Sequence, residues 1–551
     1  MKQLQITLNN ELREFAQYTP VKEALTGFGI DPELPVIGAM HNNYLKGLNA
    51  GLSTSGTLQP VTLDSSFGHR IYRKSLCFLM NLAGHRIFNE RSPRISHSMG
   101  DGYFFYPPED TPLTDAKITR LKAEMQRLIR EDLPITPETL SQTEALDIFN
   151  IPGREETRLL VQQRNSRKVN CLECDGFYDL DHFPLVPRTG VLTVWDLVPY
   201  KHGVVLQFPP KALPMQLKAL AEKPLLFGAF DEYNRWGRIL GVPNLPYLNK
   251  LTGSREIEHF ITVAEALHDK KLNGIADQIA RRRKEIKVVL IAGPSSAGKT
   301  TFSKKLAIHL EVVGFRPRVI GLDNYFVPRE QTPLDTNGEY DFEALEALDI
   351  DLLNKHLLAL AEGEEVAIPV FDFKVGNRKP EGSPLRMEPN DILIMEGIHG
   401  LNPDLVPRIP QEQTFRIYIS ALTQLNIDSH NRISTTDNRL IRRMVRDSQF
   451  RGYTASHTLQ RWPSVRRGED RNIFPFQETA DTYFNSALDY ELAVLRSYAL
   501  PLLQTVSPQE PEYAVAAVLG EFLENFQPIL PDKVPRLSIL REFIGGSGFN
   551  Y

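Results

Sequence analysis

The octapeptide GPSSAGKT, at Gly293–Thr300, is the segment of the chain best suited to chemistry. It matches the pattern G-x-x-x-x-G-K-[ST], in which the backbone N–H groups of a tight loop surround phosphate oxygens. The apolar run KVVLIAG before it predicts a buried strand, and the residues after it predict a helix whose N-terminus adds a positive dipole. We therefore predict a nucleotide-binding site. Its residues are Gly293, Pro294, Ser295, Ser296, Ala297, Gly298, Lys299, Thr300 and Thr301.

Three side chains predict how this site handles phosphate and metal. Lys299 places a positive charge near the β- and γ-phosphates, so we expect it to take part in catalysis, and the Thr300 hydroxyl is a Mg²⁺ ligand. Glu396 ends the apolar run Asp391–Glu396, a position from which a carboxylate commonly organises Mg²⁺; the alternative is a structural carboxylate. ATP and Mg²⁺ are the expected cofactors.

Asp323 ends another predicted strand, Arg318–Leu322. The carboxyl ends of parallel strands line the ligand crevice, so this carboxylate is expected to face the nucleotide. There it can accept the proton of an attacking hydroxyl, which predicts a catalytic base. The alternative is an ordinary helix cap or loop aspartate.

The segment DNRLIRRMVRDSQFRG, residues 437–452, predicts a helix rich in arginine. Spacings of three and four residues put several of its arginines on one face. Guanidinium groups match phosphate oxygens, so the helix is suited to a lid that closes over the reaction, whereas the alternative is a solvated basic helix. The arginines are Arg439, Arg442, Arg443, Arg446 and Arg451.

The region from about Lys287 to about Leu488 resembles the uridine kinase and phosphoribulokinase family of P-loop kinases. The resemblance rests on the order and spacing of GPSSAGKT, LDNYF, YDFEAL at 340–345, FDFKVGNR at 371–378, MEGIHGL at 395–401 and DNRLIRRMVRD at 437–447. It implies ATP-dependent transfer of the γ-phosphoryl group to a hydroxyl of a nucleoside. It also implies that Asp323 is the base, that Asp341, Phe371 and Arg378 bind the acceptor, and that Arg439, Arg443 and Arg446 belong to the lid.

Two features depart from this family. Uridine and cytidine kinases read approximately Y-D-F-x-x-H-S-R in the acceptor motif, where this chain has Phe371 for the phenol and Gly376 for the base-reading histidine. A site that loses such hydrogen-bond donors loses discrimination, so a uridine-type acceptor is the family default only. The stretch 451–475 is also longer and more basic than the family's lid. The alternatives are a kinase for another nucleoside or sugar phosphate, and an RNA-binding regulator that uses the loop as a nucleotide-driven switch.

The N-terminal half resembles parts of threonyl-tRNA synthetases. Residues 1–64, with ITLNNELREF and VIGAMHNNYLKGL, are similar to the small β-grasp TGS domain, and ISHSMGDGYFFY and FYDLDHFPLVPRTG are similar to the editing-type second domain. Two zinc-binding pairs of that domain align with Arg73 and Cys77, and with Asp181 and Leu185. Arginine and leucine do not ligate zinc, so we expect neither catalytic zinc nor editing activity. A face made by His69, Arg70, Arg73 and Lys74 is a candidate for RNA or anion binding.

The hydrophobic patterns predict a multidomain α+β and α/β protein. We expect a β-grasp domain at 1–64, an α+β editing-like region at 65–267, a basic linker helix at 268–286, and a P-loop NTPase fold with a parallel sheet at 287–551. The predicted strands are 2–8, 35–40, 102–106, 191–197, 287–293, 318–322, 391–396 and 415–420. The predicted helices are 21–26, 72–88, 114–132, 268–287, 299–313, 342–361, 437–450 and 477–485.

Composition narrows the class of protein. The 551 residues include 63 basic and 68 acidic side chains, and the net charge of −5 excludes a protein that coats nucleic acid by global positive charge. Three cysteines exclude a disulfide scaffold. No secretory pattern opens the chain, and no apolar run approaches the roughly 20 residues of a membrane span. We expect a cytoplasmic protein that acts on a small molecule, with no membrane contact. A homo-oligomer and contact with RNA or tRNA through the N-terminal half are further expectations.

Overall fold

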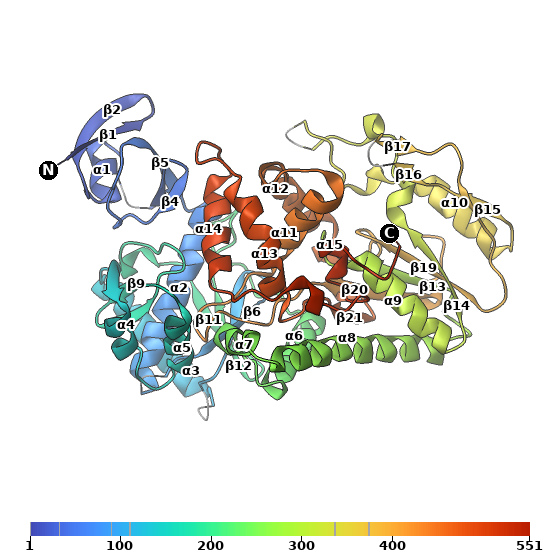
Figure 1. Cartoon of the computed structure of the whole chain (residues 1–551), viewed down its shortest axis with the longest axis horizontal. Coiled ribbons are helices and arrows are strands. Elements are labelled where there is room, and N and C mark those ends of the chain that lie inside the picture. The colour runs from blue at the N-terminus through green and yellow to red at the C-terminus, as the bar shows by residue number, and fades with distance from the viewer. Residues whose placement is uncertain are drawn as a thin grey trace.

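The computed structural model describes residues 2–31, 34–89, 91–108, 112–335, 338–372 and 375–550. In Figure 1 the blue N-terminal sheet lies at one end of the molecule, and the parallel sheet of the C-terminal half lies at the other. Helices of the C-terminal half, coloured orange and red, fill the space between the two.

The N-terminal sheet has five strands in the order β2-β1-β5-β3-β4. Its central pair, β1 and β5, is parallel and its other pairs are antiparallel. Leu4, Ile6 and Leu8 point to one face of the sheet, which packs against α1, whereas Ile37 and Val61 on the other face pack against α2. The elements are β1 Gln3–Leu8, β2 Glu11–Ala16, α1 Val21–Gly27, β3 Val36–His41, β4 Tyr44–Lys46 and β5 Gly56–Thr62.

The next region contains two antiparallel sheets, one of three strands (β10-β9-β8) and one of four (β11-β12-β7-β6). The predicted strand 191–197 is wrong in position, because 189–191 forms a 3₁₀ turn and the strand that pairs with β12 begins at Asp196. The elements are α2 Ser66–Ile87, β6 Arg94–Ser98, β7 Gly102–Tyr106, α3 Asp115–Glu131, β8 Thr136–Ser141, α4 Gln142–Ile148, α5 Glu155–Gln163, β9 Lys168–Cys174, β10 Phe177–Leu180, β11 Asp196–Tyr200 and β12 Gly203–Gln207.

Three helices lead from this region to the parallel sheet: α6 Pro224–Ile239, α7 Leu245–Thr252 and α8 Glu256–Arg281. The predicted linker helix at 268–286 is the second half of α8, which begins twelve residues earlier and ends five residues sooner. Leu272, Ile275 and Ile279 on α8 are buried, so one face of the helix belongs to the core instead of being solvated on all sides.

The C-terminal sheet is five-stranded, entirely parallel and ordered β14-β19-β13-β20-β21. All five residues of its central strand β13 are buried. Val288 and Leu290 point to the side of α10, whereas Val289 and Ile291 point to the side of α8 and α9, so helices cover both faces. The strands are β13 Val288–Ala292, β14 Arg316–Gly321, β19 Asp391–Gly397, β20 Thr414–Ser420 and β21 Thr482–Asn485. The predicted fold class, multidomain α+β with a C-terminal parallel sheet, is confirmed.

Three helix predictions in this half need correction. Residues 477–485 are not a helix: 474–479 form a 3₁₀ turn, and β21 follows because the buried Phe484 packs into the sheet core at its edge. Residues 342–349 are not α-helical either: 345–347 form a 3₁₀ turn, and Asp349 caps the start of α10 by accepting from Leu352 N–H. The arginine-rich helix ends at Arg446 and continues as a π-helical turn through Arg451.

The remaining elements surround the sheet. The helices are α9 Lys299–Val312, α10 Ile350–Ala361, α11 Thr435–Arg446, α12 Ala455–Asn472, α13 Glu491–Gln504, α14 Tyr513–Glu524 and α15 Arg541–Ile544. Four short strands form two hairpins: β15 Val366–Ile368 pairs with β18 Ser383–Leu385, and β16 Phe371–Asp372 pairs with β17 Asn377–Arg378.

One hydrophobic core crosses the boundary between the two halves of the chain. Val161 and Val169 of the editing-like region belong to the same buried cluster as Leu425 and Leu523 of the C-terminal half. Polar contacts accompany it: Arg154 Nη2 donates to Asp179 Oδ1 at 2.8 Å, and the His430 ring lies within hydrogen-bonding distance of both side chains. The two halves therefore pack as one body.

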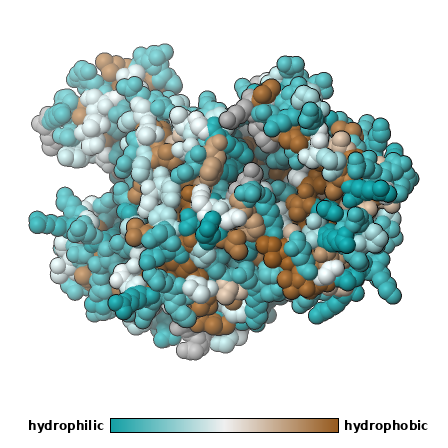
Figure 2. Space-filling view, turned by 45° about the vertical axis from the view of Figure 1, so that its right-hand side comes forward, coloured by the Kyte–Doolittle hydropathy of each residue, from teal (hydrophilic) through white to brown (hydrophobic). Residues whose placement is uncertain are grey.

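The face drawn in Figure 2 is mostly hydrophilic, with hydrophobic residues in small groups among polar ones. Among the described residues, no helix is both long enough and apolar enough to cross a membrane.

The buried group Arg154–Asp179–His430 gives the first prediction. Burial alone raises the pKa of Asp179, but the charges of Arg154 and His430 outweigh it and hold the pKa below its ordinary value. We expect Arg154→Met to lower the free energy of unfolding by about 3–5 kcal/mol at pH 7.5, because it leaves a buried carboxylate unpaired. A lowered pKa stabilises the fold above the ordinary value near 4 and loses that effect as pH falls, so the deficit should shrink in acid.

The measurement is chemical unfolding of both proteins at pH 7.5 and pH 4.5. Arg13→Met is the control, because Arg13 pairs with Glu11 on the surface and such pairs contribute about 0–1 kcal/mol. Equal effects of the two substitutions would contradict a role for Arg154 in joining the halves.

Candidate active site

The phosphate-binding loop joins β13 to α9 at the carboxyl end of the parallel sheet. Gly298 has a φ of +83°, a conformation that glycine adopts without steric cost. Gly293 is needed for a different reason: a Cβ there would stand 2.1 Å from the carbonyl oxygen of Ile419. The two glycines thus permit the turn and its close approach to β20.

The structure places the predicted lysine, threonine and glutamate together. Lys299 Nζ donates to the carbonyl oxygens of Gly293 and Pro294 at 3.0 and 3.3 Å, so its charge lies over the loop. Thr300 Oγ1 donates to Glu396 Oε1 at 2.8 Å. Burial raises the pKa of Glu396 to about 7, with the nearby charge of Asp323 adding to the effect and that of Lys299 opposing it.

The Thr300–Glu396 pair fits Mg²⁺. Both side chains present oxygen atoms, which Mg²⁺ prefers, and this ion usually keeps waters and phosphate oxygens instead of a full set of protein ligands. No group of three or more His, Cys, Asp or Glu side chains in the described ranges is arranged to hold a metal. A two-residue site completed by nucleotide and water is consistent with both observations.

Asp323 lies in the 3₁₀ turn Leu322–Tyr325 that follows β14. Residues Gly321 and Glu396 are paired between β14 and β19, so Asp323 reaches the same edge of the sheet as Glu396. Its side chain is exposed, as a base that meets an external hydroxyl must be.

Glu343 is a carboxylate at this edge that sequence reasoning missed. Its Oε2 is buried and has no hydrogen-bond partner among the described residues. Burial raises its pKa to about 7, and the charges of Glu469 and Asp323 add to the effect. Glu343 lies inside the motif YDFEAL, of which only Asp341 was predicted to be a site residue.

The predicted acceptor residues occupy different surroundings. Asp341 is buried and its carboxylate is 3.6 Å from the Arg471 guanidinium. The Phe371 ring packs near that of Phe326, with 5.7 Å between centroids. Residues 373 and 374 of the same motif lie outside the described residues.

Arg378 is fully engaged by protein atoms. It donates to the carbonyl oxygens of Tyr325 and Phe326 at 2.9 and 3.0 Å, and to Asp349 Oδ2 at 3.0 Å. It therefore fixes the turn after Asp323 in this structure, and a direct contact with an acceptor stays a prediction.

The arginine-rich helix α11 is buried, which excludes the solvated basic helix. Arg439 Nε donates to Ser295 O at 2.9 Å, and Arg443 Nη1 donates to Ser295 Oγ at 2.8 Å. Arg442 contacts the next residue of the loop, Ser296 O, at 3.3 Å and forms an ion pair with Glu491. Three predicted clamp arginines thus hold the loop itself, whereas Arg446 pairs with Asp447 at 2.9 Å.

Two carboxylates, from segments far along the chain, accept hydrogen bonds from N–H groups of the phosphate-binding loop. Glu469 Oε1 accepts from Ser295 N–H at 3.0 Å and forms ion pairs with Arg439 and Arg466. Glu542 Oε2 accepts from Thr301 N–H at 3.0 Å and from Thr301 Oγ1 at 2.7 Å. Anionic oxygens therefore already lie at two donors that a nucleotide phosphate would use.

Glu469 belongs to α12, the helix formed by the stretch that is unusually long for the family. The helix lies along the acceptor segment: Arg467 pairs with Asp335 at 2.9 Å, and Asn472 Nδ2 donates to Glu343 O at 2.6 Å. A Cβ at Gly468 would stand 2.2 Å from Glu343 Cβ, so glycine allows this close contact. α12 thus bridges the phosphate-binding loop and the acceptor segment.

The aligned zinc positions of the N-terminal half are packed in protein. The Arg73 guanidinium lies over the Tyr103 and Phe208 rings, 5.7 and 5.4 Å from their centroids. Burial raises the pKa of the Cys77 thiol to about 11 and that of Asp181 to about 6. Leu185 is buried.

The neighbouring cysteines and basic residues also face the interior. Cys171 and Cys174 belong to different hydrophobic cores, so their thiols do not converge. Arg70, one of the candidate RNA-binding residues, pairs with Asp437 of α11 at 3.0 Å. This residue therefore joins the halves in the structure.

Comparison with known proteins confirms both resemblances. Residues 288–493 match the model of the Phosphoribulokinase / Uridine kinase family. The chain is 28% identical to a uridine kinase from Anoxybacillus flavithermus over 200 residues, which are 36% of this chain and 85% of that enzyme. It is 29% identical to a threonine–tRNA ligase from Carboxydothermus hydrogenoformans over 195 residues, which are 34% of this chain. The match spans only 30% of the length of that ligase.

Among solved structures, the chain is similar to D-glycerate 3-kinase from Cryptococcus neoformans var. grubii. Identity is 16%, the TM-score is 0.24, and the match covers 48% of this chain and 89% of that one.

Glu542 gives the prediction that tests the carboxylates at the loop. We expect Glu542→Gln to lower the Kd for ATP about three- to tenfold, because a neutral amide competes less well than a carboxylate for the Thr301 N–H. The measurement is isothermal titration calorimetry with a non-hydrolysable ATP analogue. Glu524→Gln, on the exposed end of α14, is the matched control. An unchanged or higher Kd in Glu542→Gln would show that Glu542 and nucleotide do not compete.

Proposed function

We propose that the protein is an ATP- and Mg²⁺-dependent kinase that transfers the γ-phosphoryl group to a hydroxyl of a small acceptor, a uridine-type nucleoside by family default. The observation that carries the proposal is the meeting of the loop, the Thr300–Glu396 pair and the exposed Asp323 at one edge of the parallel sheet. The family match over 288–493 supports the reaction class.

The residues divide the work of phosphoryl transfer. Loop N–H groups and Lys299 bind the β- and γ-phosphates, and Thr300 and Glu396 are the residues that would hold Mg²⁺. When bound, the ion supplies charge neutralisation of the phosphates. Asp323 accepts the proton of the acceptor hydroxyl while that oxygen forms its bond to the γ-phosphorus and the bond to the β-phosphate oxygen breaks.

A phosphorylated sugar is the second candidate acceptor. The side chain of Arg329 lies against Gly376, where its carbons and Nε come within about 3 Å of the position of a Cβ, so a guanidinium replaces the base-reading histidine of the family. A guanidinium in the acceptor segment favours an anionic acceptor over a neutral pyrimidine.

The experiment is ATP consumption with a panel of nucleosides and sugar phosphates. Uridine or cytidine turnover supports the family default, and turnover of a sugar phosphate alone supports the second candidate. ATP hydrolysis that no acceptor stimulates, together with RNA binding, would instead support a nucleotide-driven RNA-binding regulator, because a switch needs no base at Asp323.

Asp323→Asn tests the catalytic base. The substitution keeps the shape of the side chain but removes the proton acceptor, so kcat should fall about 10²–10⁴-fold with nucleotide affinity little changed. Steady-state kinetics and nucleotide titration measure the two effects, and Asp351→Asn, exposed on α10, is the control. Loss of ATP binding would contradict the base and point to a metal role.

Lys299→Ala tests the phosphate-binding loop independently. Because the substitution removes the charge at the β- and γ-phosphates, we expect phosphoryl transfer to be abolished while the far-UV circular dichroism spectrum is kept. Near-wild-type turnover of this variant would place the active site elsewhere.

A further inference from the structure

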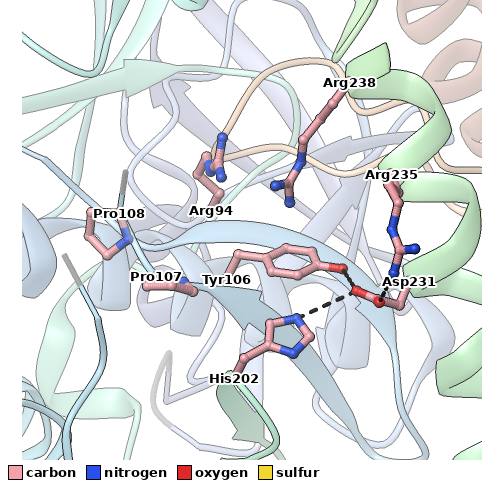
Figure 3. Close-up of a pocket in the computed structure, with 8 residues that line it drawn as sticks. All are labelled: Arg94, Tyr106, Pro107, Pro108, His202, Asp231, Arg235 and Arg238. Atoms are coloured by element: carbon pink, nitrogen blue, oxygen red, sulfur yellow. Dashed lines mark hydrogen bonds and ion pairs between the residues drawn. The ribbon is translucent and has the colours of Figure 1, made fainter. Parts of the chain in front are cut away.

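A cavity of about 500 Å³ lies apart from the phosphate-binding loop, between α6 and the sheet edge formed by β6 and β7. Among the described residues, its walls contain three arginines and one aspartate. Figure 3 shows Arg94 and Arg238 pointing toward the same opening above the Tyr106 ring. The remaining lining residues are Pro107, Pro108, His202, Asp231 and Arg235.

The fold brings these side chains together from separate elements. Arg94 and Tyr106 are opposite one another in the antiparallel pair β6–β7. Asp231, Arg235 and Arg238 are spaced by four and three residues on α6, which places them on one helix face.

The charge of the aspartate is already balanced. Asp231 accepts from Tyr106 Oη at 3.3 Å and lies 3.6 Å from Arg235. His202 Nε2 is 3.5 Å from the same carboxylate. Figure 3 shows these contacts converging on Asp231, away from Arg94 and Arg238.

Arg238, one of the two arginines on the other side of the opening, contacts an aromatic ring. Its guanidinium lies 5.4 Å from the Tyr106 ring centroid. His202 stacks on Tyr106, at 5.3 Å between centroids, so the ring is held in place. Two guanidinium groups at one opening match the charge and the oxygens of a phosphate.

A smaller cavity of about 60 Å³ adjoins the first and shares Arg94, Tyr106 and Arg238 with it. Asn244 Oδ1 and Gln424 Nε2 line this inner cavity, are buried, and have no hydrogen-bond partner among the described residues. Unpaired buried polar atoms are costly, so these two atoms require a partner. One acceptor and one donor that line the same cavity suit a hydroxyl group, which both donates and accepts.

Two acidic residues line the inner cavity. Glu156 lines the inner cavity and forms hydrogen bonds with Ser429 and Asn244. Asp428, also in its wall, accepts from the backbone N–H groups of His430 and Asn431. These two carboxyl groups repel an anion, but they do not repel a neutral hydroxyl.

We propose that the two cavities together bind a small phosphate ester whose body carries hydroxyl groups, with the phosphate between Arg94 and Arg238 and a hydroxyl at Asn244 and Gln424. A sugar phosphate and a nucleoside monophosphate share this chemistry.

The site joins the halves of the chain. Its inner wall includes four residues of the segment that follows β20 in the C-terminal half: Gln424, Asn426, Asp428 and Ser429. Ile95 N–H donates to Ser429 O at 3.0 Å, and Asn426 Nδ2 donates to Ile95 O at 2.8 Å, so this segment is fixed next to Arg94. The same segment leads into α11, whose arginines hold the phosphate-binding loop.

The test is isothermal titration calorimetry of the full chain, with a non-hydrolysable ATP analogue saturating the phosphate-binding loop. The probes are ribose 5-phosphate, uridine monophosphate, inorganic phosphate, ribose and gluconate. We expect at least one of the two esters to bind with a Kd below about 1 mM, inorganic phosphate to bind more weakly, and ribose not to bind. The stronger ester identifies the source.

Variants separate this site from the acceptor pocket. Arg94→Gln and Arg238→Gln should each raise the Kd of the ester about tenfold, as loss of a charge-assisted hydrogen bond predicts. Arg238 is exposed, so its variant tests the proposal without risk to folding. Lys250→Gln is the control, because this exposed lysine of the neighbouring helix α7 lines neither cavity, and it should change the Kd less than about threefold.

Gln424→Leu tests the inner cavity, since it should weaken the ester but not inorganic phosphate. Three outcomes would overturn the proposal: no saturable binding of either ester, binding that survives Arg94→Gln and Arg238→Gln, and binding of gluconate alone.

Discussion

Two buried arginines of α11 hold the phosphate-binding loop in place. Arg439 and Arg442 are almost fully excluded from solvent, and a buried guanidinium must find acceptors for its donors. These two find them in loop carbonyl oxygens and in the carboxylates of Glu469 and Glu491. The loop, α12 and α13 are thereby fixed relative to one another. The N-terminal half joins this arrangement through the Arg70–Asp437 ion pair at the start of the same helix.

Local signals in the sequence were enough to predict the centre of the site. GPSSAGKT needs only a strand before it and a helix after it, so its position at β13 and α9 follows from residues close in the chain. Thr300 and Glu396 meet because Thr300 follows β13 and Glu396 lies near the end of β19, and the carboxyl ends of parallel strands lie together. The regular elements with clear periodicity, among them β7, β19 and α9, were predicted to within one or two residues.

Contacts between residues that are far apart in the sequence could not be predicted from local patterns. Glu542 reaches Thr301 from 241 positions away, and no spacing rule connects the two. β21 was predicted as a helix because only its pairing with β20 makes it a strand. The cavity beside α6 was missed for the same reason, since Arg94 and Arg238 are 144 positions apart within the editing-like region and meet only in the folded chain. The helix α12 was not predicted because it contains Pro463, and proline inside a segment usually indicates the end of a helix.

The hydrophobic cluster that contains Val161, Val169, Leu425 and Leu523 affects how the protein unfolds. Neither half can be cut away without exposing apolar surface that the other now covers, so residues 66–550 form one cooperative folding unit with a shared melting transition. The N-terminal sheet is divided between two clusters: Leu4 and Ile6 form a cluster of their own with α1, whereas Ile37 and Val61 pack in one cluster with α2. A protease that samples transient openings would therefore reach the outer strands β1 and β2 before the strands that α2 covers.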